Sequence, residues 1–243
     1  MPYSLLVLFD LGLVIHAYRT GRAYPWIMLI LMVPGLGGLA YIAVEIAPQW
    51  LGTYKGQRAK GALFNAIDPT RRYRELKDQL DIVDTLANRA AVAEEALNLG
   101  KFDEALTHYR AIVAAPLGDE PGYFLGLARA EFSLADFPAS IATLEEIKQR
   151  WPDLRSPDGH LLYARALEGA GRNDEALASY ENVGAYYPGV EPQVRQAQLL
   201  AKLGQAEEAR AVATRVATGL ARAPAHVQNA QREWANAAKA LSR

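Results

Sequence analysis

Residues 99–105 read Leu-Gly-Lys-Phe-Asp-Glu-Ala, and related versions of this phrase return three times further along the chain. The later copies are Leu-Ala-Asp-Phe-Pro-Ala-Ser at 134–140, Ala-Gly-Arg-Asn-Asp-Glu-Ala at 170–176 and Leu-Gly-Gln-Ala-Glu-Glu-Ala at 203–209. Their final small residues are separated by 35, 36 and 33 positions. This regular self-similarity predicts a stack of repeated structural units over residues 86–223.

The phrase and its period near 34 resemble the tetratricopeptide repeat family. The resemblance implies that each repeat is a pair of antiparallel helices and that the pairs stack into a superhelix. We therefore expect an all-α fold in which residues 86–223 form an α-solenoid of about four tetratricopeptide repeats.

Residue size within the repeats fits this expectation. Small residues stand where the two helices of a repeat should approach closely, and large ones fill the space further along the second helix. The small residues are Ala93, Ala128, Ala164 and Ala197 in the first helices and Ala105, Ser140, Ala176 and Ala209 in the second; the large ones are Tyr109, Leu144 and Tyr180. Prolines at 116, 152 and 188 should end the second helices. The fourth repeat departs from the pattern, with Ala206 and Ala213 at positions that usually hold aromatic residues.

Both ends of the array should carry extra helices. Asp68 and Pro69 suit the N-cap and first turn of a helix over 68–90, whose apolar residues recur at three- or four-residue spacing. Its first part, 68–85, should connect to the first repeat and cap it, although the stripe also suits a short dimeric coiled coil. At the other end, residues 224–243 should form a capping helix whose Trp234 covers the last repeat.

The first helix of each repeat should line the concave side of the array, where a partner segment would bind. Arg129 and Arg165 occupy equivalent positions in adjacent repeats, so their guanidinium groups suit an extended peptide with a carboxylate and apolar side chains. Alternatively, both arginines only solvate this face or pair with Glu94 and Glu168. The predicted groove residues are Glu94, Asn98, Leu125, Arg129, Phe132, Leu161, Arg165, Glu168, Gln198 and Lys202.

A different signal precedes the repeats, because residues 25–44 contain no charged side chain. As one helix, twenty residues would rise about 30 Å, the thickness of the hydrocarbon layer of a bilayer. Residues 4–18 are also apolar apart from Asp10 and His16. We therefore expect a two-helix transmembrane hairpin over residues 1–48, with Asp10, Trp26, Pro34, Gly35 and Gly38 as the residues that shape this membrane anchor. A cleaved signal peptide is the alternative, but no small-x-small cleavage site follows the first run.

Several residues of this region carry a second resemblance. Asp10, the segment 16–19, the segment 24–27, the segment 34–37 and Tyr41 resemble the N-terminal membrane domain of bacterial cardiolipin synthases and related phospholipase D-type proteins. The resemblance covers about residues 5–46 and implies a membrane anchor. The catalytic His-x-Lys-x4-Asp motif of those enzymes is absent from this sequence, so the resemblance implies no catalysis.

Charge is distributed unevenly along the chain. Residues 1–74 hold eight Lys or Arg against three Asp or Glu, whereas residues 75–243 hold eighteen against twenty-four. The basic excess lies mostly in and just after a linker at 49–67. Positive charge beside a membrane segment favours the cytoplasmic side and can also contact anionic lipid headgroups. We expect a protein of the bacterial inner (cell) membrane whose repeats face the cytoplasm.

The sequence offers no constellation for catalysis. There is no cysteine, and His108 and His160 stand in different repeats without a second ligand at metal spacing. We therefore expect no enzyme, no cofactor and no metal, and the acidic repeat region disfavours nucleic acid as a partner. The favoured function is a membrane-anchored scaffold or adaptor that binds a protein or peptide in the repeat groove. The alternative is a non-catalytic accessory subunit of a membrane phospholipid or cardiolipin enzyme, with membrane lipid as a partner.

Overall fold

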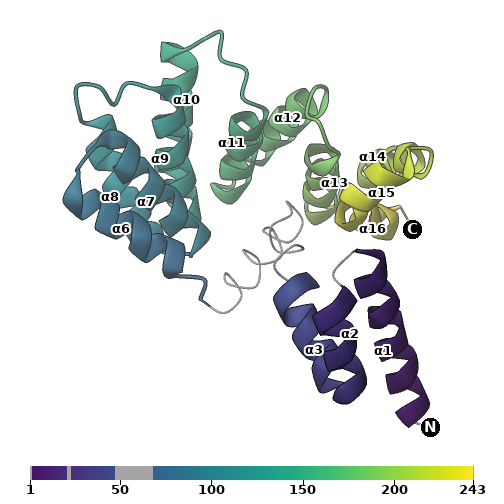
Figure 1. Ribbon diagram of the computed structural model, residues 1–243. Helices are drawn as coiled ribbons and strands as arrows, with labels where there is room; N and C mark the ends of the chain where they lie inside the picture. The colour runs from purple at the N-terminus through teal and green to yellow at the C-terminus, as the bar shows by residue number, and fades with distance from the viewer. Residues whose placement is uncertain (1, 21–22, 47–67, 243) are drawn as a thin grey trace. The chain divides into compact units, whose positions relative to one another are not determined.

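The computed structural model describes residues 2–20, 23–46 and 68–242, and these ranges contain helices and turns but no strand (Figure 1). The chain divides into two compact units, Met1–Arg71 and Arg72–Arg243. The second unit contains the repeats, and the all-α solenoid predicted from the sequence is confirmed.

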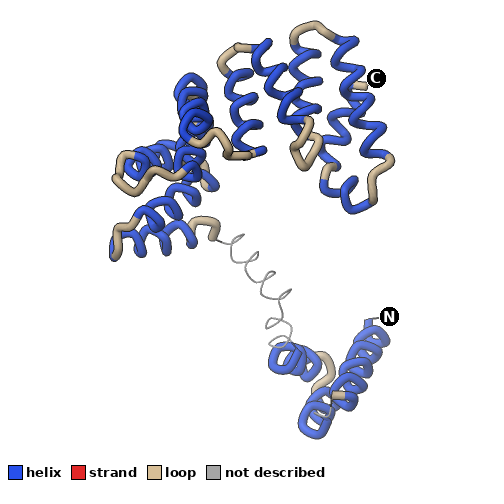
Figure 2. The backbone as a smooth tube through the Cα atoms, turned by 90° about the horizontal axis from the view of Figure 1, so that it is seen from above, coloured by secondary structure: helices blue, strands red, loops and turns tan. Residues whose placement is uncertain are grey.

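Four helix pairs follow one another along the array, as Figures 1 and 2 show. Each pair consists of a first helix and an antiparallel second helix joined by a short turn. The pairs are α7 (Leu86–Asn98) with α8 (Phe102–Val113), α9 (Pro121–Ser133) with α10 (Phe137–Arg150), α11 (Pro157–Gly169) with α12 (Asn173–Gly184), and α13 (Glu191–Lys202) with α14 (Ala206–Ala221).

The turn inside each pair requires one residue in the left-handed backbone region. Gly100, Gly171 and Gly204 hold this position with φ of 73°, 76° and 82°. In the second repeat the same position is Ala135, with φ of 59°. Because a Cβ atom clashes with the backbone in this region, Ala135 is strained where the other three repeats are not.

Close packing between helices depends on residues with almost no side chain. Ala93, Ala105 and Ala176 are fully buried at 0% exposure. A Cβ atom added at Gly126 of α9 would lie 2.3 Å from the buried ring of Tyr109 on α8. The tyrosine of one repeat therefore packs directly on the backbone of the next, and the repeats stack without a gap there.

Additional helices flank the array at both ends. The predicted helix 68–90 is in fact two helices, α6 (Arg71–Ile82) and α7, because the Thr85 side chain accepts a hydrogen bond from the Asn88 amide at 3.1 Å and caps a new helix. Tyr73 of α6 is buried against Val92 and the other core residues of the first repeat.

The C-terminal segment is likewise divided, into α15 (Ala225–Ala230) and α16 (Arg232–Leu241). Gln231 lies at the junction, and its side chain accepts a hydrogen bond from the Val190 amide at 3.3 Å. Trp234 of α16 packs with Val216 and Leu220 of the fourth repeat.

The first unit contains α1 (Pro2–Arg19), α2 (Ala23–Met32), α3 (Leu36–Tyr41) and a short π-helix, η1 (Ile42–Ile46). The predicted transmembrane hairpin is wrong, since no helix in the described ranges is both long enough and apolar enough to cross a bilayer. The uncharged run 25–44 is broken, because α2 ends at Met32 and Gly35 turns the chain with φ of 84°. The ten residues of α2 rise only about 15 Å. The 18-residue α1 includes Asp10, His16 and Arg19.

Four of the residues predicted to shape a membrane anchor, Asp10, Trp26, Gly35 and Gly38, instead make contacts within this small unit. Asp10 is buried at 7% exposure, and its Oδ2 accepts a hydrogen bond from the Gly35 amide at 2.9 Å. Gly38 packs against the Asp10 carboxylate, where a Cβ atom would come within 2.6 Å of Oδ1. Trp26 donates to Glu45 at 3.3 Å, and Pro34 stands exposed in the turn after α2.

The predicted basic linker 49–67 lies outside the described residues. The cytoplasmic placement of the repeats was inferred from the charge of that region, and it stays a prediction.

We predict that Ala135→Gly raises the free energy of unfolding by about 0.5–1 kcal/mol, because glycine adopts the left-handed backbone conformation without strain. The greater entropy of glycine in the unfolded chain offsets part of this gain. Gly171→Ala should lower the free energy of unfolding by a similar amount, since its added Cβ atom meets nothing within 4 Å and only the backbone is strained. Urea unfolding followed by circular dichroism measures both.

Gly122→Ala is the control for these two variants, because Gly122 lies in α9 in open space without positive φ. It should be neutral or mildly stabilising. A lower stability for Ala135→Gly than for the wild type would contradict strain at this turn.

Candidate functional site

The residues predicted to line the groove lie on the first helices of the four repeats at different depths. Asn98, Arg129, Gln198 and Lys202 are exposed; Glu94, Leu125, Phe132, Arg165 and Glu168 are half-buried; Leu161 is buried at 5% exposure. Leu161 therefore belongs to the core beneath the groove, whereas the others can contact a partner. That these residues form a binding surface stays a prediction.

Arg129 is already paired within the protein. Its Nη1 donates to both carboxylate oxygens of Glu94, at 3.0 and 2.9 Å. The Tyr109 hydroxyl donates to the same carboxylate at 3.2 Å, and burial followed by the charge of Glu94 raises the pKa of Tyr109. Arg129 therefore adopts the pairing that the sequence left as an alternative, and much of its charge is neutralised.

Arg165 has different surroundings. Its guanidinium carbon lies 4.7 Å from the centroid of the Phe132 ring, which itself contacts Phe137 edge to face with centroids 5.5 Å apart. Among the described residues, no carboxylate lies within 4.0 Å of the Arg165 guanidinium. The nearby Glu168 instead accepts a hydrogen bond from the Tyr180 hydroxyl at 2.7 Å. Arg165 therefore places its positive charge on an aromatic face, and the described part of the chain supplies no ion-pair partner for it.

Besides burial, the guanidinium of a second arginine, Arg195, lowers the pKa of Arg165. Burial lowers the pKa of Arg165, and the charge of Arg195 on α13 is the next largest cause. Arg195 donates to Glu191 at 2.7 Å and lies 5.1 Å from the Trp234 ring centroid. We call Arg165 and Arg195 the arginine pair. An anion bound there would offset both the mutual repulsion and the loss of hydration.

Sequence reasoning missed Arg195. The groove residues were predicted from their position within each repeat. Arg195 stands directly after Val194, at a position that this prediction did not assign to the groove. The neighbouring repeat brings its charge close to Arg165, and this depends on how the two helices are spaced. The sequence signal was weak, because Arg195 can also pair with Glu191 one helical turn earlier.

Metal chemistry has no candidate centre in the parts of the chain that the structure describes. No group of three His, Asp or Glu side chains there could hold a metal ion. The two histidines of the repeats are separate: His160 hydrogen bonds to Tyr186, and His108 has a buried Nδ1 without a partner in the described residues.

Comparisons with known proteins agree with the helical arrangement. A tetratricopeptide repeat model matches residues 158–189, the region of α11 and α12. The crystal structure of a thermophilic tetratricopeptide repeat protein from Thermus thermophilus is similar over 74% of this chain and 95% of that chain, with a TM-score of 0.55 and 20% sequence identity. No curated protein matches the chain in sequence.

These findings establish an α-solenoid of the tetratricopeptide type. Proteins built from such repeats generally bind protein or peptide partners. Neither finding supports the resemblance of residues 5–46 to cardiolipin synthases, nor the lipid partner that it implied.

We predict that stability of the array falls as the pH drops below about 6.5, partly because of His108. Burial lowers the pKa of His108 from its ordinary 6.5, and Glu104 offsets this only in part. The unfolded chain then binds a proton more readily than the folded chain, so protonation favours unfolding in this window. His108→Gln should lose less stability than the wild type between about pH 7.5 and pH 5.5.

The measurement is urea unfolding at several pH values. The exposed His226 provides a control variant, His226→Gln, which should keep the pH dependence of the wild type. An unchanged pH dependence in His108→Gln would show that the buried ring does not contribute.

Proposed function

We propose that this protein is a protein-interaction scaffold whose concave face binds an extended, acidic peptide segment of a partner. The observation that carries the proposal is Arg165, a half-buried guanidinium stacked on Phe132 with no carboxylate within 4.0 Å among the described residues. A half-buried cation without an ion-pair partner loses part of its hydration, so a carboxylate supplied by a ligand is the group that this position favours.

The groove also restricts where the acidic group can bind. Arg129 is held by Glu94, which would repel an approaching carboxylate. The arginine pair lies between the third and fourth repeats and is opposed mainly by Glu191, which Arg195 already binds. A peptide carboxylate should therefore be directed to Arg165, with the face of Phe132 beside it available to an apolar side chain.

The form of the ligand follows from the fold. Stacked helix pairs present one continuous concave surface, and an extended segment can contact several repeats at once. Exposed Asn98, Gln198 and Lys202 offer polar contacts at the two ends of that surface. This supports a binding module that selects a short linear sequence by one acidic contact and neighbouring apolar ones.

We predict that a display library of unstructured peptides, selected on the full chain, becomes enriched in Asp or Glu flanked by apolar residues. Arg165→Gln should weaken the selected peptides roughly ten- to hundredfold, because it removes a charge-assisted contact worth about 1.5–3 kcal/mol. Fluorescence anisotropy with one labelled peptide from the selection measures the change.

Arg129→Gln serves as the matched control, since it removes the same charge from a residue that is already paired. It should leave the affinity within a few-fold of the wild type. Selection of the same sequences by wild type and Arg165→Gln would contradict the assignment of the acidic contact.

A further inference from the structure

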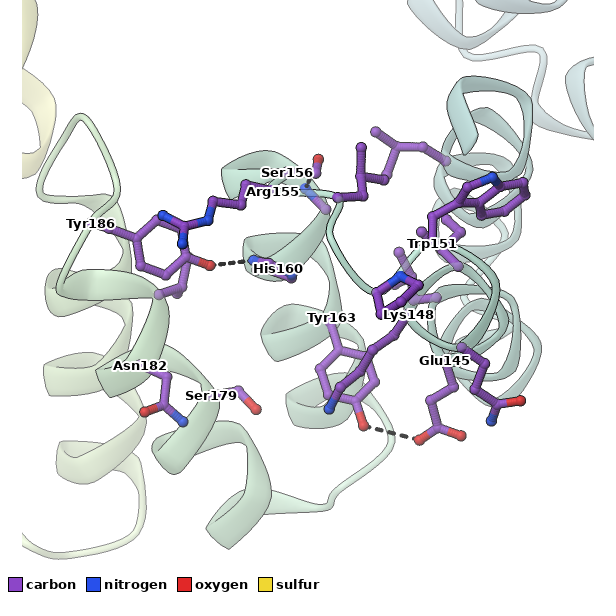
Figure 3. Close-up of a pocket in the computed structure, with 18 residues that line it drawn as sticks. Glu145, Lys148, Trp151, Arg155, Ser156, His160, Tyr163, Ser179, Asn182 and Tyr186 are labelled. Carbon is purple, nitrogen blue, oxygen red and sulfur yellow. Dashed lines mark hydrogen bonds between the residues drawn. The ribbon is translucent and has the colours of Figure 1, made fainter. Parts of the chain in front are cut away.

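A cavity of about 790 Å³ opens between the second and third repeats, where α10, the segment 151–156, α11 and α12 meet (Figure 3). Pockets for small molecules commonly enclose about 300–1,000 Å³. The cavity meets the predicted groove at Leu125 of α9, which lines both, but it does not include Arg165. His160 and Tyr163 of α11 line it, whereas Arg165 is two residues further on, about 200° around the helix from Tyr163.

One part of the cavity wall is aromatic and aliphatic. Trp151 contacts Phe124 edge to face, with ring centroids 5.3 Å apart, which holds the indole in place. Further apolar side chains of the wall include Leu125, Leu144, Ile147, Leu154, Tyr163 and Val183. This surface suits a flat aromatic or branched aliphatic body.

Another part of the wall is polar and carries positive charge. Lys148 and Arg155 line the cavity, and neither has an ion-pair partner among the described residues. By contrast, the adjacent Arg150 pairs with Glu146 at 2.8 Å and also with Asp119. The one acidic residue of the wall, Glu145, accepts a hydrogen bond from Tyr163 at 3.0 Å.

The two cations lie near the polar groups of α11 and α12. Lys148 is close enough to His160 that its charge helps burial to lower the pKa of that ring. Arg155 lies beside Tyr186 in Figure 3, and its charge acts on the Tyr186 hydroxyl. Tyr186 and His160 hydrogen bond to each other across the cavity wall. Polar and positively charged groups from three segments therefore border the cavity, with Arg155 on the side of Tyr186 and Lys148 on the side of Tyr163 (Figure 3).

We propose that this cavity binds a small organic anion, a carboxylate carried on an aromatic or branched aliphatic body. Lys148 and Arg155 supply the positive charge that attracts the carboxylate, and Trp151, Ile147 and Val183 offer apolar surface to the body. The two cations without ion-pair partners among the described residues supply charge complementarity, and the volume of the cavity suits a small molecule.

The test uses naphthalene-2-carboxylate as the probe and naphthalene-2-carboxamide as its uncharged counterpart. The 243-residue chain labelled with ¹⁵N is titrated, and the indole N–H resonance of Trp151 is followed by NMR after assignment with Trp151→Phe. The carboxylate should move this resonance, while the resonances of the other three tryptophans, Trp26, Trp50 and Trp234, should stay in place. The carboxamide should bind at least about tenfold more weakly, since it lacks the charge that Lys148 and Arg155 recognise.

Two sets of variants complete the experiment. Lys148→Gln with Arg155→Gln should weaken the carboxylate about tenfold or more, down to the affinity of the carboxamide. Arg210→Gln with Arg215→Gln removes the same net charge from α14 and should bind like the wild type. Ser179→Phe, which fills the cavity from α12, should abolish the Trp151 shift.

Three results would overturn the proposal. The first is a Trp151 resonance that does not move, or that moves only together with those of Trp26, Trp50 and Trp234. The second is equal affinity for carboxylate and carboxamide. The third is an unchanged affinity in the Lys148→Gln, Arg155→Gln variant.

Discussion

The close approach of helix to helix at positions with almost no side chain is the constraint on which the array depends. Ala93, Ala105 and Ala176 are fully buried, and the ring of Tyr109 lies directly on Gly126 of the following repeat. A larger residue at these contacts would force the helices apart, because protein interiors have few voids and little room to adjust. Such contacts fix the spacing of the repeats and therefore which side chains of the first helices remain accessible.

The same packing decides which arginine side chains of the first helices have an ion-pair partner within the protein. Tyrosines of the second helices donate to acidic residues of the first: Tyr109 to Glu94 and Tyr180 to Glu168. Glu94 is shared with Arg129, whereas Glu168 is held at 2.7 Å by Tyr180 and does not pair with Arg165. One arginine of the two equivalent positions is therefore neutralised, and the other is left with an aromatic neighbour and the nearby charge of Arg195.

The sequence predicted the repeats well because their period and their small residues are local and recurrent. The sequence has Ala135 where the other three copies of the phrase have glycine, but only the structure shows the positive φ of that residue. The error at the N-terminus has a physical cause. Counting uncharged residues treats 25–44 as one helix, but Pro34 and Gly35 introduce a turn that leaves helices of ten and six residues.

The choice of ion-pair partners could not be predicted in the same way. Arg129 and Arg165 occupy equivalent positions, and the sequence offered an acidic residue to each. Which arginine is paired depends on side-chain positions set by tertiary packing, as does the approach of Arg195 from the next repeat. The cavity was missed for the same reason, since its wall combines residues 151–156 with side chains from α9, α10, α11 and α12.

The central claim is that partners bind on the concave face at the arginine pair, and site-specific photo-cross-linking in cells tests it most directly. A photoreactive benzoylphenylalanine replaces Gln198, exposed on α13, or Glu207, exposed on α14. The account predicts a discrete cross-linked partner from position 198 that disappears in Arg165→Gln, and none from position 207. Cross-links of equal yield from both positions, or a cross-link at 198 that persists in Arg165→Gln, would contradict it.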